Sequence, residues 1–115
     1  MQEQVMKIRV VFDEGKVERE GKYDINKMYA RIDKYFSEHN IPKIGKGFYQ
    51  STGKKGEYNA FAAFQMAYSE IDWFMDNLDI WTWYDGDYEE DFKEETLKAQ
   101  KKYGRFLHNE PRLAL

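Results

Sequence analysis

The stretch Val-Met-Lys-Ile-Arg-Val-Val-Phe at residues 5–12 decides how the fold is interpreted. It is rich in β-branched residues, and its apolar side chains alternate, which is typical of a β-strand. The side chains that share one face of this strand are Met6, Ile8, Val10 and Phe12. We therefore predict a strand that ends at Asp13.

A loop and then a helix are predicted after this strand. Residues 14–22 are polar and contain two Gly, which indicates a flexible loop. Asp24 is a typical N-cap, and the apolar residues after it recur at intervals of three and four. These residues are Ile25, Met28, Tyr29, Ile32, Tyr35 and Phe36. The pattern predicts a helix to about Glu38, and Pro42 prevents it from resuming.

The middle of the chain predicts a pair of strands followed by a long helix. Residues 43–51 combine apolar residues with Gly45 and Gly47, which indicates two short strands or one bent hairpin. Residues 58–77 show an alternating and a helical pattern at once. Twenty residues are too many for an ordinary strand, and the Ala content favours a helix.

The last part of the chain predicts a strand and a final helix. Ile80-Trp81-Thr82-Trp83-Tyr84 is a typical strand sequence, which Asp85-Gly86 ends. Asp87, with Glu90 three residues later, resembles a capping box. We expect the final helix to start there and to end at Gly104.

This order of elements is βαββαβ with an added C-terminal helix, which predicts an α+β fold of the ferredoxin-like type. A chain of 115 residues has no room for two independent cores. Residues 1–115 are therefore interpreted as one domain, with a core at about 5–86 and a C-terminal helix and tail at about 87–115. In the ferredoxin-like strand order 4-1-3-2, we expect the first and third strands to be central, adjacent and parallel.

Composition and charge exclude several classes of protein. The chain has no Cys, which excludes disulfides and thiolate chemistry, and the net charge of −3 argues against a histone-like nucleic-acid binder. No apolar run approaches the roughly 20 residues of a membrane span, so we expect a soluble, cytoplasmic protein. The charge is unevenly distributed, because residues 70–95 hold 11 carboxylates and a single cation, Lys93.

The expected topology brings polar side chains to one edge of the sheet. Asp13 ends the first strand, and the sequence Ser-Thr-Gly-Lys-Lys-Gly at 51–56 follows the third. We predict a cluster formed by Asp13, Ser51, Thr52, Lys54 and Lys55. A carboxylate can act as a general base or metal ligand, while lysines offset phosphate charge. The same residues also fit a polar sheet edge without a catalytic role, and the residue pattern leaves both interpretations open.

Six short motifs follow one another along residues 8–94. They are Val-Phe-Asp at 11–13, Asn-Lys-Met-Tyr at 26–29, Gly-Phe-Tyr at 47–49, Trp-Phe at 73–74, Asp-Ile at 79–80 and Glu-Asp-Phe at 90–92. In order and spacing they resemble the virulence-associated protein D (VapD) family. That family is similar in turn to the small ferredoxin-like CRISPR adaptation nucleases.

The resemblance implies a homodimer that cleaves RNA endonucleolytically, often as the toxin of a toxin–antitoxin pair. The functional Asp of the family corresponds to Asp13, and its Tyr corresponds to Tyr49, which would position the substrate. Lys54 and Lys55 would steady the scissile phosphate. Two Asp13 carboxylates facing each other across a two-fold axis would attract Mg²⁺, whereas a lone Asp13 would act through the ribose 2′-hydroxyl. Both versions stay open.

A second function belongs to a different class of protein. Gly47 and Trp81 stand where the family has Ser and Arg, which favours a catalytically silent homodimer. Such a dimer would be a regulatory or anti-defence protein that binds a protein partner through the acidic segment 70–95. Retention of Asp13 and of the two lysines favours the ribonuclease.

Overall fold

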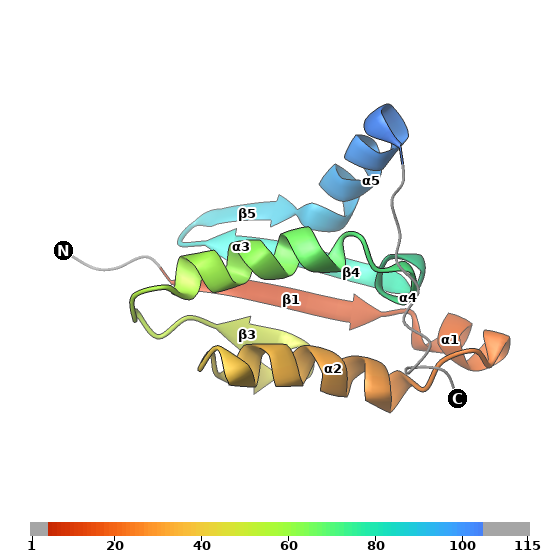
Figure 1. Ribbon diagram of the computed structural model, residues 1–115, viewed down its shortest axis with the longest axis horizontal. Helices are drawn as coiled ribbons and strands as arrows, with labels where there is room; N and C mark the ends of the chain where they lie inside the picture. The colour runs from red at the N-terminus through yellow and green to blue at the C-terminus, as the bar shows by residue number, and fades with distance from the viewer. Residues whose placement is uncertain (1–4, 105–115) are drawn as a thin grey trace.

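The central element of the computed structural model, which describes residues 5–104, is a five-stranded antiparallel sheet (Figure 1). Its order is β2-β3-β1-β4-β5. The strands are β1 (Met6–Phe12), β2 (Lys43–Gly45), β3 (Phe48–Gln50), β4 (Leu78–Asp85) and β5 (Tyr88–Asp91). The first four strands have the predicted 4-1-3-2 order, and the α+β, ferredoxin-like fold is confirmed.

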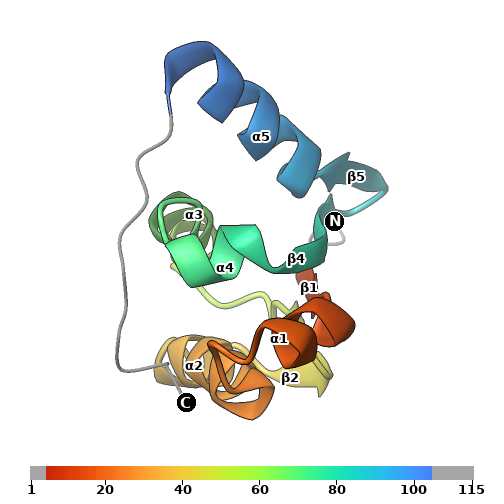
Figure 2. The same ribbon diagram turned by 90° about the vertical axis from the view of Figure 1, so that its right-hand side faces the viewer.

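Helices cover one face of this sheet. They are α1 (Glu14–Glu20), α2 (Ile25–Glu38), α3 (Glu57–Tyr68), α4 (Asp72–Asp76) and α5 (Phe92–Tyr103). Figure 2 shows α2, α3 and α4 on the same side of the strands. None of the helices within residues 5–104 is long and apolar enough to cross a membrane.

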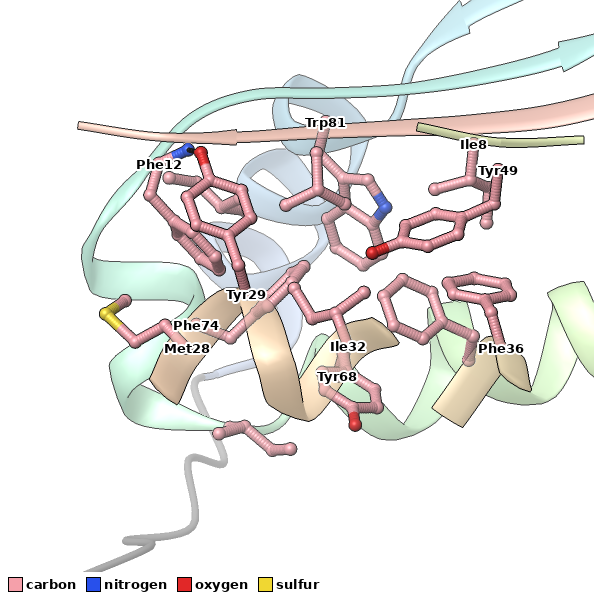
Figure 3. Close-up of a cluster of buried hydrophobic side chains, with 14 of the residues drawn as sticks. Ile8, Phe12, Met28, Tyr29, Ile32, Phe36, Tyr49, Tyr68, Phe74 and Trp81 are labelled. Carbon is pink, nitrogen blue, oxygen red and sulfur yellow. Dashed lines mark hydrogen bonds between the residues drawn. The ribbon is translucent and has the colours of Figure 1, made fainter. Parts of the chain in front are cut away.

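Aromatic rings fill the space between the sheet and these helices (Figure 3). Ile8, Val10 and Phe12 are almost fully buried, which confirms the predicted inward face of β1 at these three positions. The ring of Phe36 on α2 stacks on Tyr49 of β3, with centroids 4.1 Å apart. Large buried rings contribute most of the apolar area in a core of this size, which is how so short a chain stabilises its sheet.

The two central strands run in opposite directions, so the expectation that the first and third strands are parallel is wrong. β1 pairs antiparallel with β3, with Ile8 opposite Tyr49 and Arg9 opposite Phe48. The reason is topological. The crossover through α2 returns the chain parallel to β1 in β2, and the tight turn at Lys46 and Gly47 then reverses it in β3.

The segment predicted to be a flexible loop, residues 14–22, instead contains α1. The Asp13 side chain caps this helix by accepting a hydrogen bond from the Lys16 N–H, and Gly21 ends it in the left-handed conformation. Only Val17 is buried in it. A helix of two turns with one apolar contact has too little periodicity to be recognised in a sequence.

The single helix predicted at 58–77 is two helices. α3 ends at Tyr68, and α4 starts after Ile71, whose backbone is extended. Ile71, Trp73, Phe74 and Met75 are all buried. A straight helix buries only one of its faces, so the chain must turn to bury these neighbouring side chains together.

The start predicted for the final helix at Asp87 is also wrong. Residues 85–88 form a β-turn whose two central residues are Gly86, at φ 61°, and Asp87; β5 follows. α5 starts at Phe92, and its N-cap is Asp91, whose carboxylate accepts a hydrogen bond from the Glu94 N–H. The predicted end of the helix at Gly104 is confirmed, and the predicted tail at 105–115 lies outside the described residues.

Candidate functional site

The structure separates the residues that the sequence predicts to converge. Ser51 lies at the start of β1, where its N–H donates to the Met6 carbonyl at 2.8 Å and its hydroxyl accepts from the Met6 N–H at 2.9 Å. Asp13 follows the other end of β1. Seven strand residues span about 20 Å. Within one chain, therefore, Asp13 does not meet Ser51, Thr52, Lys54 or Lys55.

Asp13 is exposed at the end of the central strand, and the backbone around it is held firmly. Its Oδ1 accepts a hydrogen bond from the Lys16 N–H at 3.0 Å, which fixes the carboxylate over the start of α1. Its own N–H donates to the Asn77 carbonyl at 2.8 Å. The side chain is thus presented to solvent in a defined orientation.

Two other lysines, Lys16 and Lys46, lie at the same end of β1 as Asp13. The Lys16 ammonium donates to the Asp76 carbonyl beside α1. The Lys46 ammonium lies 2.6 Å from Glu14 Oε1 and 4.7 Å from the centre of the Tyr29 ring. Its hydrogen bond to Glu14 raises the pKa of Lys46, which keeps it charged. In the sequence, only the position of Lys46 directly before Gly47 pointed to a role for this lysine.

Gly47 brings that turn against β1. Its carbonyl accepts a hydrogen bond from the Val10 N–H at 2.7 Å, and its φ is 66°. A Cβ at this position would lie 2.1 Å from the Val10 carbonyl oxygen. No side chain fits there, so the backbone contact explains why glycine occupies the position and why Lys46 lies near the end of β1.

Tyr49 is fully buried and lies opposite Ile8 of β1, which is five residues from Asp13 along the chain. Its hydroxyl donates to Asp33 Oδ1, and Lys43 Nζ lies 3.1 Å from Asp33 Oδ2. Burial, and then the hydrogen bond and negative charge of Asp33, raise the pKa of Tyr49 above its ordinary value. The hydroxyl therefore stays protonated at neutral pH. Thr52 and Lys54 line the same shallow groove, of about 550 Å³.

Glu57, which sequence analysis missed, organises the loop that carries the predicted lysines. Its buried carboxylate accepts hydrogen bonds from the Thr52 hydroxyl and from the N–H groups of Thr52, Gly53 and Lys54, at 2.8–3.0 Å. Burial opposes ionisation of Glu57, but these hydrogen bonds outweigh it and lower its pKa. The N–H groups of the loop are thus used internally, while Lys54 and Lys55 are exposed.

Trp81 and Trp83 lie on the helix-covered face of the sheet. Trp81 is buried, with its ring 4.7 Å from Phe92 and 4.9 Å from Phe74. Trp83 is half-buried, and its ring is 5.4 Å from Phe61. Both rings thus pack between the sheet and the helices. An Arg at position 81 would have to bury its charge in this core.

The described residues of the chain hold no complete cation site. In the part of the chain that the structure describes, no three His, Asp or Glu side chains are grouped to hold a metal ion. Asp13 alone offers too few ligands for Mg²⁺, which prefers six oxygens. Comparison with known proteins adds no constraint, since no family model, curated protein or solved structure matches this chain.

Proposed function

We propose that the protein is a VapD-like endoribonuclease that cleaves single-stranded RNA with Asp13 and acts as the toxin of a toxin–antitoxin pair. The observation that carries the proposal is the exposed carboxylate at the end of the central strand, held by the first turn of α1. Two ammonium groups lie at the same end of β1: that of Lys16 donates to the Asp76 carbonyl, and that of Lys46 pairs with Glu14, the residue after Asp13. A positioned carboxylate with ammonium groups on the neighbouring elements is suited to the cleavage of a phosphodiester.

In the metal-free version, the reaction is a transfer within the RNA chain. Asp13 takes the proton of a ribose 2′-hydroxyl, and the 2′-oxygen bonds to the adjacent phosphorus. The bond from phosphorus to the 5′-oxygen breaks, and that oxygen takes a proton from water. The products are a 2′,3′-cyclic phosphate and a 5′-hydroxyl. Lys46 supports the step by offsetting the charge that develops on the phosphate.

The homodimer belongs to this proposal. A pair of Asp13 carboxylates across a two-fold axis would supply twice the oxygen ligands that one subunit offers, and Mg²⁺ would then activate the attacking hydroxyl. Light scattering should give a mass of about twice 13.9 kDa. A monomer at micromolar concentrations would remove the two-fold magnesium site and leave the metal-free reaction.

A catalytically silent homodimer that binds a protein partner is the second candidate. It is favoured by the distance between Asp13 and the Tyr49–Lys54 groove, because the expected catalytic set is not assembled in one chain. Its docking surface would be the acidic part of 70–95 at the β5 edge, where Glu89 and Asp91 are exposed.

The deciding experiment compares the full chain with its Asp13→Asn variant on a mixed-sequence single-stranded RNA, with Mg²⁺ or with EDTA. Asn is as good an N-cap as Asp, so the variant keeps α1 while losing the base. We expect cleavage to fall about 100-fold or more, as for removal of a general base. The EDTA arm separates the two versions of the reaction.

Equal cleavage by both proteins, or none by either, would reject the ribonuclease. In that case the silent dimer becomes the leading function. The immobilised protein would then be used to capture an antitoxin or other protein partner. The charge-reversing variant Glu89→Lys should capture less of it if the acidic edge is the docking surface.

A further inference from the structure

The sheet has a face that no helix covers in the described part of the chain (Figure 2). Side chains alternate along each strand, and the register with β3 and β4 shows which of them share this face. We call this surface the open face. Its members on the three middle strands are Lys7, Arg9, Val11, Phe48, Gln50, Ile80, Thr82 and Tyr84.

Two aromatic rings lie over the middle of the open face. Phe48 belongs to β3 and Tyr84 to β4, so β1 runs between them. Their ring centroids are nevertheless only 6.1 Å apart, so the two rings lean toward each other across β1. Both side chains are half-buried, which leaves part of each ring accessible to a ligand.

Lys7 and Arg9 emerge from β1 beside these rings. Arg9 is exposed, and neither cation forms an ion pair or side-chain hydrogen bond with a residue of the described chain. By contrast, Lys34, Lys43, Lys46 and Lys98 each lie within 4.0 Å of a carboxylate oxygen. Two unpaired cations beside two rings thus remain for a ligand.

This combination fits single-stranded nucleic acid. Bases stack on aromatic faces, and lysine and arginine neutralise the phosphates between them. A second copy of the chain fits less well. On a two-fold axis near β1, its Lys7 and Arg9 would face their own counterparts, and like charges would repel.

The edges of the open face set the direction of a bound strand. Glu89 and Asp91 of β5 lie on the same face, opposite Tyr84 and Thr82, and would repel phosphates. The favourable path therefore runs along β1. It passes Lys7, Arg9 and Val11 and reaches Asp13, about 20 Å from Lys7.

We propose that the open face is the binding track for single-stranded RNA, with bases on Phe48 and Tyr84 and phosphates on Lys7 and Arg9. The arrival of the track at Asp13 rests on the proposed ribonuclease activity, whereas binding on the face does not. Binding and cleavage can therefore fail separately.

The test measures fluorescence anisotropy of a labelled 12-nucleotide RNA with the full-length Asp13→Asn protein, which binds without cutting. The double variant Lys7→Gln/Arg9→Gln should weaken binding tenfold or more. It should also lower the slope of log K against log salt by about 1.4, since each phosphate contact on a single strand contributes about 0.7. The matched control is Lys27→Gln/Lys34→Gln on α2, which should change neither.

The aromatic part is tested with Phe48→Leu and Tyr84→Leu, which keep apolar contact with the sheet. Loss of one stacked base is expected to weaken binding about tenfold. Tyr58→Leu is the matched control, because Tyr58 is exposed on α3, away from this face. Circular dichroism confirms that each variant is folded. The charge variants keep the test decisive if an aromatic variant does not fold.

Three results would reject the binding track. The first is no RNA binding by the Asp13→Asn protein, and the second is an equal loss of RNA affinity in variants and controls. The third is a charge variant that changes only the oligomeric mass in light scattering. The last result would identify the open face as a contact between copies. Binding without any cleavage by the wild type would keep the track and reject the ribonuclease.

Discussion

The hydroxyl of Tyr49 donates a hydrogen bond to the Asp33 carboxylate, which links β3 to α2 at the level of Ile8 of β1 and not at Asp13. The phenol ring is fully buried against Phe36. Position and burial both indicate that Tyr49 holds the fold together instead of contacting RNA.

Tyr49→Phe should therefore lower stability and leave cleavage unchanged. Loss of one hydrogen bond to a partly exposed carboxylate should lower the free energy of unfolding by about 1 kcal/mol, measured with urea. Tyr58→Phe, at an exposed ring, is the control and should have no effect. A Tyr49→Phe protein that is stable but unable to cleave RNA would return Tyr49 to the catalytic set.

The lysines at the two ends of β1 should differ in their effect on activity. Lys46→Gln removes the ammonium that pairs with Glu14, the residue after Asp13, and should reduce cleavage about tenfold. Lys55→Gln removes an exposed ammonium at the other end and should leave the rate within about twofold. The reverse order of rates would mean that the loop at 51–56 reaches the reacting phosphate, for example from a partner subunit.

Gly47→Ala should be among the most destabilising single substitutions in the chain. The new Cβ would meet the Val10 carbonyl oxygen and would also require an unfavourable positive φ. We expect a loss of about 3–5 kcal/mol in urea unfolding. Gly21→Ala is the matched control, since Gly21 has a similar φ of 62° with nothing within 4 Å, and strain alone costs about 1–2 kcal/mol. An equal loss of unfolding free energy in the two variants would show that the hairpin shifts enough to relieve the clash at residue 47.

Glu57→Gln tests the carboxylate that organises residues 52–54. The folded state lowers the pKa of Glu57 below its ordinary value of 4.5. The ionised carboxylate therefore stabilises the fold in full at pH values above 4.5. This stabilisation is then lost as the pH falls through the lower, folded-state pKa. In the wild type, the free energy of unfolding should therefore decline in acid.

The Glu57→Gln variant should be about 2 kcal/mol less stable at pH 7 and should lose less stability in acid than the wild type. Urea titrations from pH 7 to pH 3 measure both quantities. Glu18→Gln, at an exposed position on α1, serves as control and should follow the wild type. A wild-type acid profile in the Glu57→Gln protein would mean that other carboxylates cause the decline.

The start of α5 is tested by a pair of aspartates. Asp91→Ala removes the N-cap hydrogen bond to Glu94 and should cost about 1 kcal/mol. Asp87→Ala, in the turn between β4 and β5, should cost less than half of that. A larger loss for Asp87→Ala would place the helix start where the capping-box pattern predicted it.

Sequence patterns predicted the elements whose signals are local. β1 alternates, α2 is capped by Asp24 and has a regular apolar stripe, and Gly104 ends α5. α1 was missed because Val17 is its single buried residue.

The candidate site was predicted less well, because its geometry depends on strand direction. The antiparallel pairing of β1 with β3 places Asp13 and Ser51 at opposite ends of β1, so the expected cluster does not form within one chain. The role of Glu57 depends on a loop that folds back over its carboxylate, and no periodicity reports such a contact. The lysines near Asp13 come from α1 and a hairpin turn, which only the folded chain brings together.

The pairing of β1 also bears on how the chain is made. On the ribosome, β1 is synthesised first, yet Ile8 pairs only with Tyr49 and Trp83, far downstream. Its apolar side chains must therefore wait for almost the whole domain to emerge before they are covered. Such non-local pairing slows folding and exposes the nascent strand to aggregation. We expect a ribosome-bound chain that stops before residue 78 to lack the protease resistance of the complete chain, since β4 is then absent.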